Sequence, residues 1–150
     1  MNIRKLHTDE HPPIDLLVLA DPSESLVEEY LHRGECFVAE SDQKIIGVYV
    51  LLPTRPETVE LVNIAVIEPM QNQGIGKRLV IHAMQTAKSR GFKTMEVGTG
   101  NSSIGQLALY QKCGFRMTGI DSNFFVKHYA EEIFENGIQC RDMVRLAKEF

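Results

Sequence analysis

Gly74 and Gly76 lie in a Q-x-x-G-x-G segment at 71–76, which follows a run of strand-forming residues at 59–67 and precedes a helical pattern. A turn into a helix collects several unpaired backbone N–H groups at one point, and the helix dipole adds partial positive charge there. Glycine lets the backbone approach a bound group closely, which a side chain would prevent. The segment therefore predicts an anion-binding loop for a phosphorylated cofactor.

Two other phosphate-binding loops fit this segment less well. A P-loop requires G-x-x-x-x-G-K-[ST], but Lys77 is followed by Arg78, and position 71 is not glycine. The dinucleotide fingerprint G-x-G-x-x-G requires a third glycine where this chain has Leu79. A turn that uses its glycines only to change direction is the remaining alternative.

The loop resembles the acyl-CoA loop of the GCN5-related N-acetyltransferases (GNAT), written [RQ]-x-x-G-x-[GA]. Further along the chain, Leu109–Phe115 reads LYQKCGF and is similar to the L-Y-x-x-x-G-F motif of the same family. The two motifs occur in the family's order, with one helix and one strand between them. The resemblance is to the bacterial type, covers about residues 34–148 and is sharpest over 58–116.

The resemblance implies a mixed α/β (α+β) sheet of about six or seven strands that splays at one end, flanked by about four helices. It also implies an acetyl-CoA-dependent N-acetyltransferase that acetylates a primary amine, either a small molecule or a protein lysine or N-terminus, by direct attack in a ternary complex. A catalytically weak acyl-CoA-binding or sensing module is the alternative. The expected cofactor contacts along the central strand and the loop are Ile64, Ala65, Val66, Gln71, Asn72, Gln73, Gly74, Ile75, Gly76 and Lys77.

Three further positions carry expected roles. Tyr110 matches the motif tyrosine that the family places near the cofactor sulfur, where it can protonate the departing thiolate, and it could instead be a core tyrosine. The family's asparagine that bonds pantetheine is replaced here by Ser103. Asn101 either takes that role or caps a helix.

A base must take the proton of the attacking amine. Glu60 on the central strand matches the glutamate base of the histone acetyltransferases in this superfamily, and Glu96 on the following strand is its competitor. A water chain could replace both carboxylates. The acceptor is expected along an acidic and aromatic rim that suits a cationic amine: Glu28, Glu29, Arg55, Glu57, Asp121, Phe124, Phe125, His128, Tyr129, Glu131 and Glu132.

The composition is typical of a globular protein and argues against several classes of function. The chain has 150 residues, 43% hydrophobic and 24% charged, which predicts one domain over 1–150. A formal net charge of −4 argues against nucleic-acid binding. Cys36, Cys113 and Cys140 lack metal-site spacing, so we expect reduced thiols in a cytoplasmic protein and no metal. No membrane partner is expected, and a homodimer through the sheet edge or C-terminal segment would follow from the family.

The elements that must position these residues can be read from periodicity and turn residues. Asp21 is expected to cap a helix that runs to about Leu31. The Pro53–Pro56 segment is expected to break the chain before the central strand. The other expected elements are strands at 2–6, 35–40, 44–52, 58–67, 93–99, 115–120 and 142–147, an apolar segment at 14–20, and helices at 75–90 and 102–112.

Overall fold

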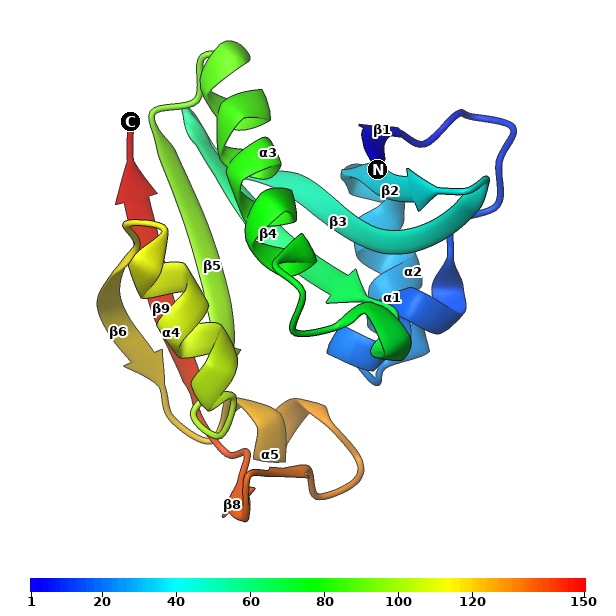
Figure 1. Cartoon of the computed structure of the whole chain (residues 1–150). Coiled ribbons are helices and arrows are strands. Elements are labelled where there is room, and N and C mark those ends of the chain that lie inside the picture. Colours follow the sequence, from blue (N-terminus) through cyan, green and yellow to red (C-terminus); the bar gives the residue numbers. More distant parts are fainter.

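The computed structural model describes residues 1–150 and has at its centre a seven-stranded sheet in the order β1-β2-β3-β4-β5-β9-β6 (Figure 1). Only β4 and β5 run parallel, and every other neighbouring pair is antiparallel, so the predicted mixed α/β sheet is confirmed. The strands of this sheet are β1 (Asn2–Lys5), β2 (Glu35–Ser41), β3 (Lys44–Arg55), β4 (Thr58–Val66), β5 (Thr94–Gly100), β6 (Arg116–Asp121) and β9 (Met143–Glu149).

Helices cover both faces of the sheet and divide the core into two clusters (Figure 1). The larger cluster lies under α3 and α4, and the smaller one lies between α1, α2 and strands β2 to β4. None of the helices combines the length and the apolar composition needed to cross a membrane. The helices are α1 (Ile14–Ala20), α2 (Glu24–Arg33), the 3₁₀ turn η1 (Glu68–Met70), α3 (Ile75–Ser89), α4 (Ile104–Lys112) and α5 (Phe124–His128).

The segment between β6 and β9 carries more structure than its sequence pattern predicts. It forms the short helix α5 and a separate hairpin of β7 (Phe134–Glu135) and β8 (Ile138–Gln139). Figure 1 shows both near the end of the molecule at which β5 finishes. This segment therefore lies beside the sheet end where the predicted site would be.

The predicted start of α2 is wrong by two residues. Ser23, not Asp21, is the N-cap, and its hydroxyl accepts a hydrogen bond from the Leu26 amide at 3.3 Å. Asp21 instead accepts hydrogen bonds from the hydroxyls of Tyr30 and Tyr129. Contrary to the local sequence pattern, the Asp21 carboxylate thus makes tertiary hydrogen bonds and does not cap the helix.

The predicted chain break at Pro53–Pro56 is also wrong, because β3 continues to Arg55. Pro53 pairs with Val59, and the register shifts between Pro53 and Arg55. A proline without an N–H is tolerated in a strand at such an irregularity. The reversal is made by Pro56 and Glu57, which has a positive φ of 61°.

The feature of the sheet that matters most for function is the separation of β4 from β5. The two strands pair only from Thr58 with Thr94 to Leu61 with Val97. Beyond that point β4 pairs with β3 alone and β5 pairs with β9 alone. Val62 is an extra residue in β4, because Leu51 pairs with Leu61 while Val50 pairs with Asn63. The splay that the resemblance implied is therefore present, and a bulge marks where it begins.

Leu17 and Leu19 on α1 offer a matched test of how this helix packs. Leu17 is fully buried, whereas the Leu19 side chain is 59% exposed. We expect Leu17→Ala to lower the free energy of unfolding by about 3 kcal/mol through cavity formation. Leu19→Ala should change it by less than about 0.5 kcal/mol. Urea unfolding measures both, and equal losses would contradict the packing described.

Candidate active site

Backbone groups of β4 face the gap beyond the last pair with β5. The Ile67 amide donates to the Ile46 carbonyl at 2.9 Å, which directs Ile67 toward β3. Because successive residues of a strand direct their backbone groups to opposite sides, Ala65 also bonds toward β3, and Ile64 and Val66 direct theirs into the gap. Of the three predicted contacts on this strand, Ile64 and Val66 therefore have backbone groups available to a ligand.

Gln71 partly closes this end of the gap. Its side-chain amide donates to the Val66 carbonyl at 3.0 Å. The Gln73 side-chain amide similarly donates to the Pro69 carbonyl at 3.2 Å. Both predicted loop glutamines therefore use their side chains to hold the loop. The Gln71 backbone amide also donates, to the Glu68 carbonyl at 3.2 Å, so of the two only the Gln73 backbone amide remains for a ligand.

Free backbone N–H groups lie at the start of α3, directly after the loop. The N-cap residue Gly74 offers no side-chain cap, and the first bond into the helix runs from the Arg78 amide to the Gly74 carbonyl at 3.2 Å. The amides of Ile75, Gly76 and Lys77 have no hydrogen-bond partner in the protein. These donors and the exposed ammonium of Lys77 form the cradle that the sequence predicted for phosphate.

The two loop glycines serve different purposes. Gly74 has a φ of +83°, and nothing lies within 4 Å of the place a Cβ would take. Gly76 has no unusual φ, and a Cβ there would lie 3.7 Å from a methyl carbon of Leu109. Asn72, with a φ of 63°, supplies a further left-handed turn. Gly74 is therefore required by the backbone and leaves open space in front of the helix.

Tyr110 is buried in the cluster under α4 and packs edge-on against Phe115, with ring centroids 5.8 Å apart. Its hydroxyl donates to no protein group, yet it is not among the fully enclosed polar atoms. Burial raises the pKa of Tyr110, so the phenol keeps its proton at neutral pH. A buried ring with an unbonded, accessible hydroxyl is what a proton donor to a bound group requires, and a core tyrosine would normally have a satisfied hydroxyl.

Glu60 and Glu96 are direct neighbours in the parallel pair of β4 and β5. Val59 and Leu61 belong to the cluster under α3 and α4, so Glu60 between them points to the opposite face, toward α2. Its carboxylate is half-buried and forms no hydrogen bond or ion pair. Burial raises the pKa of Glu60, an effect that Arg145 opposes and Glu96 reinforces.

Glu96 forms a salt bridge, whereas Glu60 has no hydrogen-bond or ion-pair partner. Arg55 lies 2.7 Å from the Glu96 carboxylate in a salt bridge at the sheet surface. An ion pair of this kind favours the charged carboxylate and occupies one of its oxygens. Of the two predicted bases, Glu60 is therefore the one with free lone pairs and an environment that favours proton uptake.

Asn101 and Ser103 hold the C-terminal segment in place. The Asn101 amide donates to the Gln139 carbonyl at 3.1 Å, and its oxygen accepts from the Arg141 and Asp142 amides at 2.8 and 3.0 Å. Ser103 is the N-cap residue of α4, but its hydroxyl donates to Glu135 at 2.9 Å and not to the helix. Both side chains predicted to bind pantetheine already have protein partners.

A polar network on the α1–α2 side was not predicted from the sequence. Asn63 on β4 donates to the Tyr30 hydroxyl at 2.7 Å and to the Leu17 carbonyl at 3.0 Å. Tyr30 donates to Asp21, and Tyr129 donates to the same carboxylate at 2.8 Å. The network therefore ties the segment after β6 to the first two helices. The Asn63 side-chain oxygen is buried without a partner, a state that usually indicates an ordered water or a ligand.

The aromatic part of the predicted rim forms one cluster. Phe124 packs against Phe125 and His128 with ring centroids 5.2 and 4.7 Å apart, and Tyr129 packs against Phe125 at 5.4 Å. The acidic part is dispersed, since Glu29 pairs with Arg33 on the exposed surface of α2. The structure therefore supports an aromatic wall more than an acidic one.

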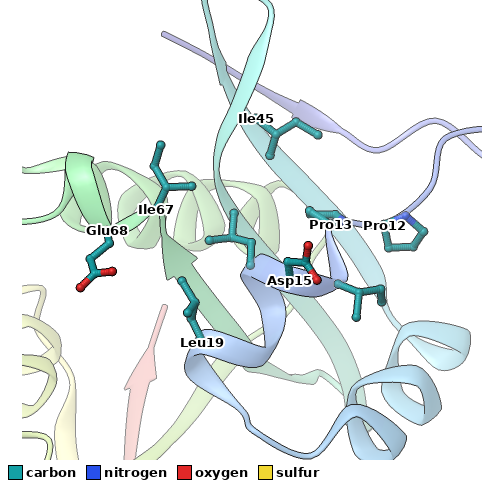
Figure 2. A pocket seen from close by; sticks show the side chains of 9 residues that line it. Pro12, Pro13, Asp15, Leu19, Ile45, Ile67 and Glu68 are labelled. Atoms are coloured by element: carbon teal, nitrogen blue, oxygen red, sulfur yellow. The ribbon is translucent and has the colours of Figure 1, made fainter.

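A separate apolar groove of about 550 Å³ lies where α1 begins, against the ends of β3 and β4. Figure 2 shows Ile67 and Glu68 on one side of it, with Pro12, Pro13 and Asp15 across from them. None of the residues predicted for the acyl-CoA loop, the motif tyrosine or the base lines this groove.

Comparison with known proteins identifies the family of this chain. Residues 2–115 match the Acetyltransferase (GNAT) family, and the chain belongs to it. It is 59% identical to Uncharacterized N-acetyltransferase YvbK from Bacillus subtilis (strain 168), with 97% of each chain covered.

Two similar solved structures contain the cofactor. One is a GNAT family acetyltransferase from Elizabethkingia anophelis with acetyl-CoA bound, at 50% identity and a TM-score of 0.97 over 99% of this chain and 97% of that one. The other is an acetyltransferase from Bacillus subtilis in complex with CoA, at 58% identity and a TM-score of 0.93 over 99% of each chain. The protein is therefore an acetyltransferase, and acetyl-CoA is its acyl donor.

The residues present fit this donor. The unpartnered amides at the start of α3 suit the phosphates of CoA, and the open space in front of Gly74 admits them. The backbone groups of Ile64 and Val66 suit the amides of the pantetheine arm.

Gly74 and Gly91 allow the loop to be tested with a matched control at the other end of α3. Gly74 and Gly91 have φ of +83° and +85°, and neither has an atom within 4 Å of its Cβ position. Alanine at either site should cost about 1 kcal/mol of stability because of the left-handed backbone. Only Gly74→Ala should also weaken acetyl-CoA binding, by about 10-fold, because its methyl group faces the phosphate cradle. Calorimetric titration with acetyl-CoA separates the two, and equal affinities would contradict the placement of the cradle.

Proposed function

We propose that the protein transfers the acetyl group of acetyl-CoA to a primary amine by direct attack in a ternary complex. The observation that carries this proposal is the gap between β4 and β5, which has Tyr110 on one face of the sheet and Glu60 on the other. The acyl donor and the acceptor amine can thus approach one another from opposite faces. The acceptor class expected from sequence, a small amine or a protein lysine or N-terminus, belongs to this proposal.

Bound acetyl-CoA supplies an acetyl group activated as a thioester. Glu60 takes the proton of the amine, directly or through water, so that the nitrogen can form the new C–N bond. As the C–S bond breaks, the Tyr110 hydroxyl gives its proton to the departing sulfur, which leaves as the thiol. Backbone donors of β4 along the gap offset negative charge that develops on the carbonyl oxygen.

The expected homodimer also remains a proposal. β6 is an edge strand of the sheet and is exposed along its whole length, with Met117 and Ile120 at 54% and 64% exposure. An exposed edge with apolar side chains favours pairing with another chain.

The proposed function is tested by thiol release from acetyl-CoA against a panel of primary amines, with acetyl-CoA binding measured on the same sample. We expect turnover with at least one amine class. Tyr110→Phe should lower kcat by roughly 10- to 100-fold, because the sulfur loses its proton donor, while acetyl-CoA affinity stays unchanged. Binding without thiol release from any amine would instead support the alternative of an acyl-CoA-binding module.

The pH profile tests the base. Glu60 accepts a proton only when ionised, so kcat/KM should fall as pH falls through its folded-state pKa. Because burial raises that pKa, the fall should begin at a higher pH than for an exposed glutamate. Glu60→Gln should lower kcat/KM about 100-fold or more and remove this limb, measured with one amine throughout. Glu96→Gln is the matched control, and the reverse pattern would assign the base to Glu96.

A further inference from the structure

Part of the sheet face that bears Glu60 is not covered by α1 or α2. The cluster under α1 and α2 draws its strand residues from β2, β3 and β4, and none from β5, β9 or β6. Arg145 on β9 lies in the uncovered part, and its neighbours across the strands are Gly98 on β5 and Gly119 on β6. Glycine on both sides leaves the guanidinium without flanking side chains from these positions.

The Arg145 side chain is held in place along one edge. Its Nε and Nη2 lie 2.8 and 2.7 Å from one carboxylate oxygen of Asp121, and its guanidinium carbon lies 5.9 Å from the ring centroid of Phe124. The side chain is 35% exposed. An arginine fixed in this way loses little further entropy when it binds a second partner.

The other edge of the guanidinium is unused. Nη1 donates to no protein acceptor, and it lies 3.5 Å from the place that a Cβ on Gly98 would occupy. The same Cβ would lie 2.6 Å from the Met143 sulfur, so a side chain at position 98 would displace this arrangement. The chain thus keeps a preorganised guanidinium with free N–H groups on the part of this face that α1 and α2 leave uncovered.

Glu60 and Arg145 point to the same face at a distance that suits one small molecule. Glu60 pairs with Glu96, and Arg145 pairs with Gly98, two residues further along β5. Two strand spacings across and two residues along place their Cα atoms roughly 12 Å apart. The two side chains are close enough for the Arg145 charge to lower the pKa of Glu60 against the effect of burial, although they form no ion pair.

Resting on the proposed function, we propose that the acceptor is an α-amino carboxylate, whose carboxylate binds the free edge of Arg145 while its amine faces Glu60. Two N–H groups of arginine match the two oxygens of a carboxylate. The positive charge of Arg145 also favours the neutral, nucleophilic form of the nearby amine. Arg145 is then a specificity-determining residue, and the aromatic wall at Phe124 receives the acceptor's side chain. An internal protein lysine, which has no free carboxylate beside its amine, would be a poor acceptor.

The experiment compares amino acids with their own amides. Thiol release is measured for phenylalanine, leucine and methionine, for their carboxamides, and for 2-phenylethylamine. The amine of an amide is less basic than that of the free acid, so more of it is neutral and the amide is favoured by chemistry alone. We expect kcat/KM for the best acid to exceed that of its amide by roughly 30-fold, the contribution of a charge-assisted, two-pronged hydrogen bond.

Variants assign this preference to Arg145. In Arg145→Gln we expect the acid-to-amide ratio to fall to about one, through loss of activity on the acid, while acetyl-CoA affinity measured by calorimetry is unchanged. Arg145→Lys keeps the charge but lacks the planar pair of N–H donors, and it should give an intermediate ratio. Arg116→Gln is the matched control, because Arg116 carries the same charge on the neighbouring strand β6, is exposed, and forms no ion pair.

Each outcome separates the inference from the function on which it rests. Faster acetylation of the amides or of 2-phenylethylamine by the unaltered protein would overturn the inference and leave amine acetylation standing. A ratio that Arg145→Gln leaves unchanged, or that Arg116→Gln lowers equally, would also overturn it. Acetyl-CoA binding without acetylation of any amine would reject the proposed function together with the inference.

Discussion

The separation of β4 from β5 is the constraint on which the rest of the site depends. A sheet normally pairs its backbone groups on both sides, and an unpaired group buried away from water costs free energy. Here the pairing ends at Leu61 and Val97, and the bulge at Val62 turns β4 away. The strand then presents the backbone of Ile64 and Val66 to a gap that an extended, amide-containing ligand can fill. In the proposed complex the cofactor arm takes the place of a strand, and the strand residues keep their side chains for the core.

The positive potential that suits the anionic donor comes from a few local groups and not from the net charge of the protein. The chain has a formal net charge of −4, yet its donor is a polyanion. Unpartnered amides at the start of α3 and the Lys77 ammonium supply positive potential at one point, where the helix dipole adds to it. On the opposite face, Arg55 neutralises Glu96 and Asp121 holds Arg145, so that Glu60 is left as the free carboxylate. The acidic composition is thus compatible with an anionic cofactor.

The acceptor side depends on contacts between segments far apart in the chain. Tyr129, which follows α5, reaches Asp21 beside α2, and Asn63 on the central strand joins Tyr30 to the same network. This network joins Tyr129, a member of the aromatic cluster, to α1, α2 and β4. A buried and nearly satisfied polar network of this kind favours one arrangement of the segments over others. The Asp21 carboxylate, which accepts from both tyrosines and from the Ser23 amide, is thus part of this network, and Ser23 caps α2.

Much of the fold could be predicted from the sequence, as could the conformation of the loop proposed to bind the donor, because these features are local. The hairpin at Asp42–Gln43, the alternation of β4, the helical period of α3 and the loop before it each depend on neighbouring residues, and each was found at or near its predicted bounds. The identification of Tyr110 also came from a local motif. The acceptor side could not be read in this way. That Glu60 is free while Glu96 is paired, that Asn101 holds the C-terminal segment, and that Arg145 shares a face with Glu60 all depend on which strands lie next to one another. The sequence by itself determined the loop and the helix that follows, and it indicated acetyl-CoA as the donor. The tertiary structure alone decided the charges opposite them, because strand order and register place residues side by side whatever their distance along the chain.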